Sequence, residues 1–428
     1  MPVPAGSGSG PAPAGLSYDP ILSRVRLSVQ IPSPAAYARI ERSTDQVRWV
    51  TVRGGTEVVP TTGGWVTLSD YEFTPDTPNW YRVRAFMAND FEIGASRNSN
   101  PYIETDTSGW TAVGGTVARS TSTPHEGVAS LLLTPDGATA TVQARVANGP
   151  VTAANFYVGA AWLRSTVART AGIAIIWRDA GGGILSQTLG STVALAAGVW
   201  TYFEVTGQAP ASATQATFVA ASMGGTPPVG HTMLVDEACF VVIGGTPVFS
   251  GAITPDLAGH VWLKSVSRPF LNRAVTVLDY SDIERPARGG LFTVPGRTAP
   301  VAVTDVRSSR RWTLEVLTND ATAARDVDLL LASGDVLLVQ APAGTDVPAG
   351  YVHVGDTRQR RTSRLGPRRV FELPCTEVAA PTADVVGATA TCQTVLNTYA
   401  TCAALLAAHP TCLSVMELIG DPTEVIVP

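Results

Sequence analysis

Eight of the aromatic side chains between residues 101 and 245 are the part of the sequence best suited to ligand chemistry. A flat aromatic ring can stack on the apolar C–H face of a sugar while neighbouring polar groups hold its hydroxyls. Alternate side chains of a β-strand point to opposite faces, so about half of these rings are expected in a core. The eight aromatics are Trp110, Phe156, Tyr157, Trp162, Trp177, Trp200, Tyr202 and Phe203.

Motifs of the common catalytic classes are missing from the sequence. There is no Gly-x-Ser-x-Gly elbow, no His-Glu-x-x-His zinc motif and no Gly-Lys-Thr phosphate loop. Only five histidines are present, and the aromatic-rich strands hold no pair of acids. A glycosidase needs only two carboxylates, which spacing alone does not exclude. On balance we expect a protein without catalytic activity.

The composition indicates several β-rich domains. The 428 residues exceed what one core can organise, and roughly 100–200 residues per domain predicts two to four domains. With 40 glycines, 31 prolines and only 15% charged residues, the chain suits many short strands joined by turns. The net charge of -5 gives no reason to expect a nucleic-acid partner. No run of about 18 apolar residues exists, so we expect no membrane span.

Residues 1–15 form an arm rich in Pro, Gly, Ser and Ala, which we expect to be flexible or partly extended. The arm has neither a basic start nor an apolar stretch, so it does not look like a signal peptide. We therefore expect a protein made in a cytoplasm, with its odd number of cysteines reduced. The five cysteines are Cys239, Cys375, Cys392, Cys402 and Cys412. Lys264 is the only lysine, which we interpret as codon bias in a GC-rich genome.

Residues 16–100 are predicted to form a sandwich of short strands. The segments 25–31 and 80–86 alternate between apolar and polar residues, and turn residues separate the runs. The segment DYEFTPDTPNWYRVRAF resembles the late strands of a fibronectin type III domain, in which a proline-containing turn precedes an aromatic strand. The resemblance implies an Ig/fibronectin-like sandwich with Tyr81 near the corner tyrosine position.

Residues 101–245 resemble carbohydrate-binding modules of the family 4/9 jelly-roll type. The opening NPYIETDTSGWTAVGGTVARSTSTPHEGVASLLLTPDG has that family's first strand, tryptophan and turn before an apolar strand. The segments GVWTYFEVTGQAPASATQATFVAASM and HTMLVDEACFVV resemble the last strands of the same fold. The resemblance implies a jelly roll that binds a glycan.

The same resemblance selects candidate site residues. Trp162 and Trp177 lie in mid-unit strands, where the family usually builds its groove, and Tyr157 is the third candidate. Glu104 and Asp236 fall where the family's structural calcium site draws carboxylates, which are ligands that calcium prefers. The alternative is that both are surface acids at strand ends. No other cofactor is expected.

Residues 246–385 are predicted to form a β-barrel with one helix. Strand patterns dominate, but residues 321–333 place Val327, Leu330 and Leu331 on one helical face. A barrel with one crossing helix, ending in the strand RRVFELPCTEVAAP, resembles the tail-tube-like domain of siphophage distal and minor tail proteins.

Residues 386–428 contain three consecutive ten-residue repeats, TCQTVLNTYA, TCAALLAAHP and TCLSVMELIG. Each begins with a threonine that can cap a short helix, and an apolar pair follows in the next turn. Such short helices are not stable alone in water, so we expect them to dock on the barrel or on a neighbouring chain. The strict spacing of the cysteines favours packing over a zinc site.

The densest charge in the chain is a cluster of six arginines. It has no interleaved aromatics to support nucleic-acid recognition. We expect a hairpin at a subunit interface, because arginine suits ion pairs with carboxylates of a neighbouring subunit. The six residues are Arg358, Arg360, Arg361, Arg364, Arg368 and Arg369.

Together these resemblances imply a structural minor tail protein at the tail tip of a phage that infects a high-GC, actinobacterial host. The C-terminal domain would anchor in the tail as a homo-oligomeric ring, a trimer or hexamer, with other phage tail proteins as partners. The jelly roll would adhere to host cell-wall glycan. The alternatives are accessory modules of a secreted carbohydrate-active enzyme, or a tail spacer that binds no sugar.

Overall fold

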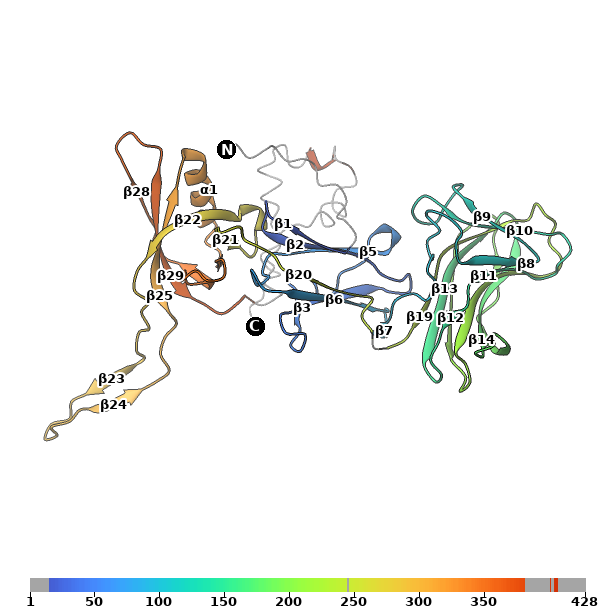
Figure 1. Cartoon of the computed structure of the whole chain (residues 1–428), viewed down its shortest axis with the longest axis horizontal. Helices are drawn as coiled ribbons and strands as arrows, with labels where there is room; N and C mark the ends of the chain where they lie inside the picture. The colour runs from blue at the N-terminus through green and yellow to red at the C-terminus, as the bar shows by residue number, and fades with distance from the viewer. Residues whose placement is uncertain (1–14, 245, 382–400, 402–403, 407–428) are drawn as a thin grey trace.

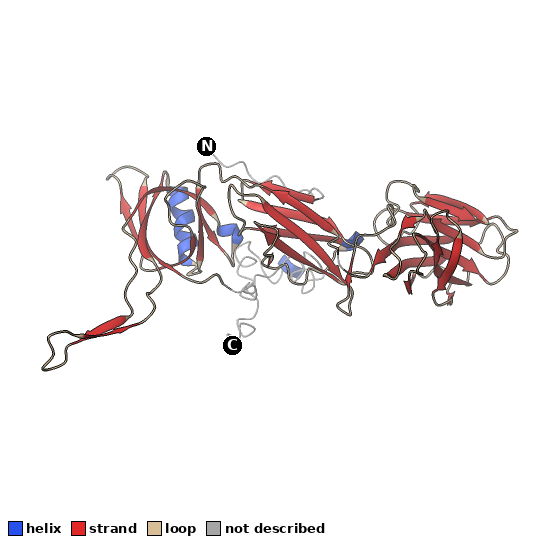
Figure 2. Ribbon diagram, turned by 60° about the horizontal axis from the view of Figure 1, so that its bottom comes forward, coloured by secondary structure: helices blue, strands red, loops and turns tan. Residues whose placement is uncertain are grey.

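The computed structural model describes residues 15–244, 246–381, 401 and 404–406. It is an all-β, multidomain protein in which three β-rich bodies follow one another along the long axis. A sandwich lies in the middle, with a jelly roll at one end and a barrel at the other (Figures 1 and 2). No helix in the described part of the chain is long and apolar enough to cross a membrane.

The middle sandwich consists of two antiparallel sheets. One sheet has the order β1-β2-β5 and the other β20-β6-β3-β4, with β7 added beside β6. Alternation along β6 buries Tyr81, Val83 and Ala85 in the core between the sheets. The Tyr81 hydroxyl donates to Asp70 at 2.7 Å. The strands are β1 (Gly15–Asp19), β2 (Arg24–Gln30), β3 (Tyr37–Ser43), β4 (Val50–Thr51), β5 (Trp65–Asp70), β6 (Asn79–Phe86), β7 (Glu92–Ile93) and β20 (Phe249–Ile253).

The pairing of β20 corrects the boundary expected between residues 245 and 246. The sequence pattern places residues 249–253 in the third unit, but as β20 they pair with β6 and complete the sheet of the sandwich. The jelly roll is therefore an insertion between two strands of the sandwich, β7 and β20, rather than a link in a simple series. The error has a physical reason: alternation identifies a strand, but it does not name a partner more than 160 residues away in sequence.

The jelly roll has a five-stranded sheet of order β17-β13-β19-β10-β9 and a larger sheet of order β15-β14-β18-β11-β8. Short strands β12 and β16 flank β18 and β14. The main core of the module lies between the two sheets. The strands are β8 (Trp110–Val113), β9 (Gly115–Ser120), β10 (Ser130–Pro135), β11 (Val142–Val146), β12 (Gly149–Pro150), β13 (Phe156–Ser165), β14 (Arg169–Arg178), β15 (Ile184–Leu189), β16 (Val193–Leu195), β17 (Thr201–Gln208), β18 (Gln215–Met223) and β19 (Met233–Val242).

The third body is a closed barrel with one helix, as expected. Its strand order is β25-β22-β21-β26-β27-β29, and pairing of β25 with β29 closes it, while β28 adds to β29. Helix α1 (Ala321–Ala332) begins after Asp320, whose side chain accepts from the backbone N–H of Thr322 and Ala323. The strands are β21 (Val261–Ser265), β22 (Arg273–Tyr280), β25 (Arg311–Thr318), β26 (Leu337–Gln340), β27 (Gly350–Val354), β28 (Arg358–Arg361) and β29 (Arg369–Glu377).

A two-stranded ribbon projects from the barrel. It consists of β23 (Gly289–Phe292) and β24 (Val301–Thr304), which pair only with each other. Figure 1 shows the ribbon extending well away from the barrel wall. Leu291 and Val303 are largely exposed on it. An isolated hairpin of this kind has marginal stability in water.

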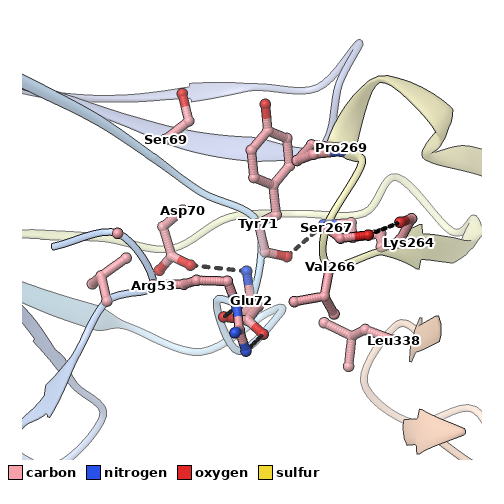
Figure 3. A pocket seen from close by; sticks show the side chains of 13 residues that line it. Arg53, Ser69, Asp70, Tyr71, Glu72, Lys264, Val266, Ser267, Pro269 and Leu338 are labelled. Atoms are coloured by element: carbon pink, nitrogen blue, oxygen red, sulfur yellow. Dashed lines mark hydrogen bonds and ion pairs between the residues drawn. The ribbon is translucent and has the colours of Figure 1, made fainter. Parts of the chain in front are cut away.

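The barrel is joined to the sandwich through buried polar contacts, and Figure 3 shows the pocket beside them with Lys264 and Tyr71 in its lining. Lys264 is almost fully buried, and its ammonium donates to the backbone carbonyls of Ser23 at 2.6 Å and Tyr71 at 2.9 Å. Burial lowers the pKa of Lys264 to about 7. Gln340 donates to the Phe73 carbonyl at 2.6 Å. A cavity of about 130 Å³ lies beside these contacts.

The jelly roll is joined to the other end of the sandwich by apolar packing. Val158, Cys239 and Val241 of the jelly roll belong to the same buried cluster as the sandwich core. Tyr102 donates to the Ile31 carbonyl at 2.8 Å across this joint. Buried contacts at both joints therefore hold the jelly roll and the barrel at opposite ends of the sandwich.

Most of the expected terminal features lie outside the described residues. These are the arm up to residue 14 and nearly all of the repeat region, with Cys392, Cys402 and Cys412. Within the repeats, Thr401 is described, and its hydroxyl oxygen accepts from the Ala404 N–H at 3.1 Å, as expected of a cap. Cys239 and Cys375 are buried free thiols.

Candidate functional site

Two of the three predicted glycan-binding residues lie in the core. Tyr157 is 0% exposed, and its hydroxyl accepts from the Thr152 N–H at 2.8 Å. Trp177 is 1% exposed, and its indole N–H donates to Thr188 at 2.9 Å. The choice of these two residues is therefore wrong, because neither ring can present a face to a sugar. Their place in mid-unit strands was right, but the strand register turns them inward.

Trp162 points outward from the five-stranded sheet. On β13, Ala161 and Leu163 face the core, so Trp162 between them faces away from it. Tyr202 of β17 is its direct cross-strand partner, with ring centroids 5.4 Å apart. Tyr202 is 38% exposed, which makes it the most accessible ring of this pair. Sequence reasoning named Tyr202 among the aromatics but did not select it.

His125 packs against the same ring of Trp162. It comes from the turn between β9 and β10. Its ring stacks on the Trp162 ring, with the two ring centroids 3.9 Å apart. Trp200 approaches His125 edge-on at 5.5 Å. We use the name aromatic face for His125, Trp162, Trp200 and Tyr202. The alternation of β13 and β17 brings two of these rings together, whereas His125 and Trp200 come from turns.

Carboxylates surround the aromatic face. Glu237 lies 2.7 Å from His125 Nδ1, and Glu204 accepts from the Tyr202 hydroxyl at 3.0 Å. Burial raises the pKa of Glu237 above its ordinary value. Glu204 is exposed to solvent and can accept further hydrogen bonds. The face therefore combines apolar rings with acceptors for hydroxyl groups.

The two expected calcium ligands hold the turn that carries His125. Asp236 accepts from the N–H groups of His125 at 3.0 Å and Glu126 at 3.3 Å. Glu104 accepts from the Val128 N–H at 2.9 Å. Gly127 has a φ of +66°, where other residues are strained, and a Cβ there would push the Glu104 carboxylate away from the turn.

The calcium site itself stays a prediction. Among the described residues, no three His, Cys, Asp or Glu side chains gather in a way that could hold a metal. The oxygens of Asp236 bind backbone donors instead, including the Glu237 N–H at 2.8 Å. Burial raises the pKa of Asp236 to about 7, although its backbone hydrogen bonds act in the opposite direction.

The outward face of the larger sheet has a different character. Ile176 of β14 and Val219 and Ala221 of β18 form a small buried apolar cluster on it. Arg145 of β11 lies beside Val219, and Arg178 continues the outward row of β14. We use the name arginine face for these five residues. It carries none of the eight aromatics singled out from the sequence.

The predicted interface arginines lie on the exposed hairpin of β28 and β29. Arg360 already pairs within the chain, with Glu315 at 2.9 Å and Glu372 at 3.1 Å. That pairing departs from the expectation that it would seek carboxylates of a neighbouring subunit. The role of the other five, Arg358, Arg361, Arg364, Arg368 and Arg369, stays a prediction.

Comparisons with known proteins find similarity only at the level of solved structures. No family model and no curated protein sequence matches the chain. The C-terminal family 22 carbohydrate-binding module of a Clostridium thermocellum xylanase is 20% identical, with 35% of this chain and 97% of that chain covered and a TM-score of 0.28. A xylan-binding domain from Paenibacillus barcinonensis is 15% identical, with coverage of 34% and 93% and a TM-score of 0.29.

A phage protein is also among the similar structures. The enzymatically active domain of tailspike protein 4 from bacteriophage CBA120 is 13% identical, with a TM-score of 0.29. The match covers 35% of this chain and 21% of that chain. A two-module fragment of the same Clostridium xylanase is likewise covered over only 28% of its length.

Proposed function

We propose that this chain is a non-catalytic structural protein of a phage tail tip that displays a glycan-binding jelly roll. In this proposal the barrel anchors the chain in the tail, and the jelly roll contacts the host envelope. The arrangement in Figure 1 supports it, because the two bodies lie at opposite ends of the sandwich. A module at the far end from its anchor is well placed to reach a cell surface.

The aromatic face is the observation that carries the glycan-binding part of the proposal. Tyr202 and Trp162 are neighbours on adjacent strands, and Glu204 lies beside them with accepting capacity. A sugar ring can pack on the solvent side of the rings while Glu204 accepts from its hydroxyls. Aromatic contacts of this kind contribute roughly 0.5–1.5 kcal/mol each. One site would be weak, and several copies in a ring would strengthen binding through multivalency.

The barrel supplies the surfaces for anchoring. The exposed ribbon of β23 and β24 and the hairpin of β28 and β29 both project from it. A ribbon of two strands is marginally stable by itself, and exposed arginines suit ion pairs across an interface. Further copies of this chain and other tail proteins are the partners we propose, in a ring of three or six.

A spacer without sugar binding is the second candidate, and one observation favours it. His125 covers one face of Trp162, and the turn that carries His125 also reaches the sandwich, where Glu126 accepts from the Gly63 N–H. The aromatic face could then serve mainly to stiffen the joint.

Binding of the full chain to purified actinobacterial cell-wall polysaccharide distinguishes the two candidates. Tyr202→Ala and Trp162→Ala are expected to weaken binding about tenfold, which corresponds to losing one aromatic contact. Phe156→Ala is the matched control, since Phe156 is an exposed aromatic on β13 outside the aromatic face. Absence of binding by folded, multivalent wild-type protein to cell walls and to a glycan array would leave the spacer.

A further inference from the structure

The arginine face is an outward sheet surface with an apolar floor. Val219, Ile176 and Ala221 are between 2% and 5% exposed, although no second layer of strands covers this side of the sheet. Long side chains on the same face, Arg145 and Arg178 among them, can lay their aliphatic stems over such a floor while their charged ends reach solvent. The guanidinium groups are therefore displayed above an apolar surface.

The position of Arg178 is fixed by two hydrogen bonds. Its Nε donates to Thr217 at 3.0 Å, and Nη1 donates to the Gly182 carbonyl at 2.8 Å. Thr217 lies on β18, between the strands that carry the two arginines, so the guanidinium extends across the sheet toward β11. Its Nη2 group has no partner among the described residues and is available to a ligand.

Arg145 lies on β11, on the other side of β18, and has more free donor groups than Arg178. Its Nε donates to Gln143 at 2.8 Å on the same strand. Both terminal nitrogens of the guanidinium stay free within the described part of the chain. Burial lowers the pKa of Arg145, and the positive charge of Arg178 lowers it further. The two arginines lie on the strands that flank β18, with Arg145 opposite Val219 and Arg178 opposite Gln215.

Neither arginine has a carboxylate partner among the described residues. The acid nearest in sequence, Asp179, accepts instead from the N–H groups of Gly181 at 2.9 Å and Gly183 at 2.8 Å. Two like charges held near each other over an apolar floor favour an anion that neutralises both. A planar carboxylate matches the paired terminal N–H groups of Arg145.

We propose that the arginine face binds a polysaccharide that carries carboxylate groups, such as a polymer of uronic acids. Arg145 and Arg178 would hold the carboxylates, and the amide N–H groups of Gln143, whose oxygen accepts from Arg145, would donate to sugar hydroxyls. The aliphatic stems of the two arginines, which lie over the apolar floor, would pack against the C–H groups of the sugar rings. A single-stranded nucleic acid fits less well, because its bases need aromatic side chains for stacking. This site is separate from the aromatic face, which lies on the opposite sheet.

The test compares retention of the full chain in gels containing alginate, a polymer of uronic acids, with retention in gels containing neutral dextran. Alginate is expected to retain the wild type at 50 mM salt and much less at 500 mM, since the contact is ionic. Dextran is expected to have no effect. The variant Arg145→Gln is expected to bind alginate about tenfold more weakly, as for loss of a charge-assisted hydrogen bond, and Arg145→Gln with Arg178→Gln more weakly still.

A charge-matched double variant, Arg48→Gln with Arg325→Gln, serves as the control. Both residues are exposed and lie on the sandwich and the barrel, so alginate binding should stay at the wild-type level. Arg145→Gln is the variant to trust if loss of the Arg178 bonds unfolds the module, because Arg145 bonds only within its own strand. Equal loss in the control, equal retention by dextran, or tighter retention by single-stranded DNA or polyphosphate than by alginate would overturn the proposal. Tyr202→Ala should leave alginate binding unchanged, so failure here is distinguishable from failure of the aromatic face.

Discussion

The two outward faces of the jelly roll differ in chemistry although they belong to sheets of the same module. The aromatic face combines rings with carboxylates, whereas the arginine face combines an aliphatic floor with guanidinium groups. Glu204, Asp236 and Glu237 all belong to strands of the five-stranded sheet, and Arg145 and Arg178 belong to the larger one. The strands of the larger sheet carry arginines and no acid, whereas those of the five-stranded sheet carry these acids together with Arg119 and Arg164.

The difference indicates that strand register, more than composition, decides which side chains of the module reach its surface. Trp162 and Trp177 occupy neighbouring strands in sequence, yet one ring faces outward and the other fills the core. A shift of β13 by one residue would turn Trp162 into the core, and a shift of β14 would turn Trp177 outward. The predictions below test whether the two faces are as distinct in energy and in binding as they are in geometry.

The largest expected effect is on stability and comes from the inward tryptophan. Trp177→Ala removes a fully buried ring and its hydrogen bond to Thr188, so the jelly roll should lose about 3–5 kcal/mol of unfolding free energy. Trp162→Ala removes a partly exposed ring and should cost only about 1 kcal/mol. Scanning calorimetry of the full chain, following the jelly-roll transition, measures both. Similar losses for the two variants would contradict the assignment of inner and outer faces.

A smaller effect concerns pH and the carboxylate that holds the His125 turn. The pKa of Asp236 is raised from 3.8 to about 7, so the folded state keeps a proton that the unfolded state has released between these values. The contribution of Asp236 to stability is therefore present at acidic pH and lost as the pH rises through about 7. It amounts to no more than about 4 kcal/mol.

Melting of the jelly roll between pH 4 and 8 checks this effect. Asp236→Asn should reduce the fall of the melting temperature with rising pH, whereas Asp136→Asn should leave this fall as in the wild type. Asp136 is an exposed loop residue whose pKa is held below its ordinary value by the Thr139 side chain. If Asp236→Asn melts with the same pH dependence as the wild type, the backbone hydrogen bonds lower the pKa of Asp236 as much as its burial raises it.

Much of the fold was predictable because it depends on local patterns. The alternation of β6 and the helical face of α1 can each be found in a short window of sequence, and the structure confirms both. Partners distant in sequence were not predictable in the same way. Neither the pairing of β20 with β6 nor the burial of Lys264 against the Ser23 carbonyl has a local signal.

The candidate site was predictable only in part. The sequence shows that the jelly roll is rich in aromatic residues, and it places Trp162 on a strand of the binding surface. The choice of Tyr157 and Trp177 failed because single-sequence alternation shows that two faces exist without showing which one faces the core. The bulge in β13 between Ala160 and Trp162 adds to this ambiguity, because the pairing with β19 shifts there. The arginine face had no sequence signal, since its two arginines are 33 residues apart on strands separated by β18.

The smallest expected effect distinguishes a binding surface from a stiffened joint. His125→Ala removes the ring stacked on Trp162 at 3.9 Å and the contact with Glu237 at 2.7 Å. The stack should cost roughly 0.5–1.5 kcal/mol of stability when lost, and Trp162 fluorescence should shift to longer wavelength as the ring meets water. Glycan binding should persist, because Tyr202 and Glu204 remain in place and a second face of Trp162 opens. Alginate binding should not change, because the arginine face lies on the opposite sheet. If His125→Ala instead abolishes glycan binding while leaving the melting temperature intact, then His125 itself contacts the sugar. If His125→Ala loosens the joint and Tyr202→Ala and Trp162→Ala leave glycan binding at the wild-type level, the aromatic face is structural, and the arginine face is the remaining glycan site of the module.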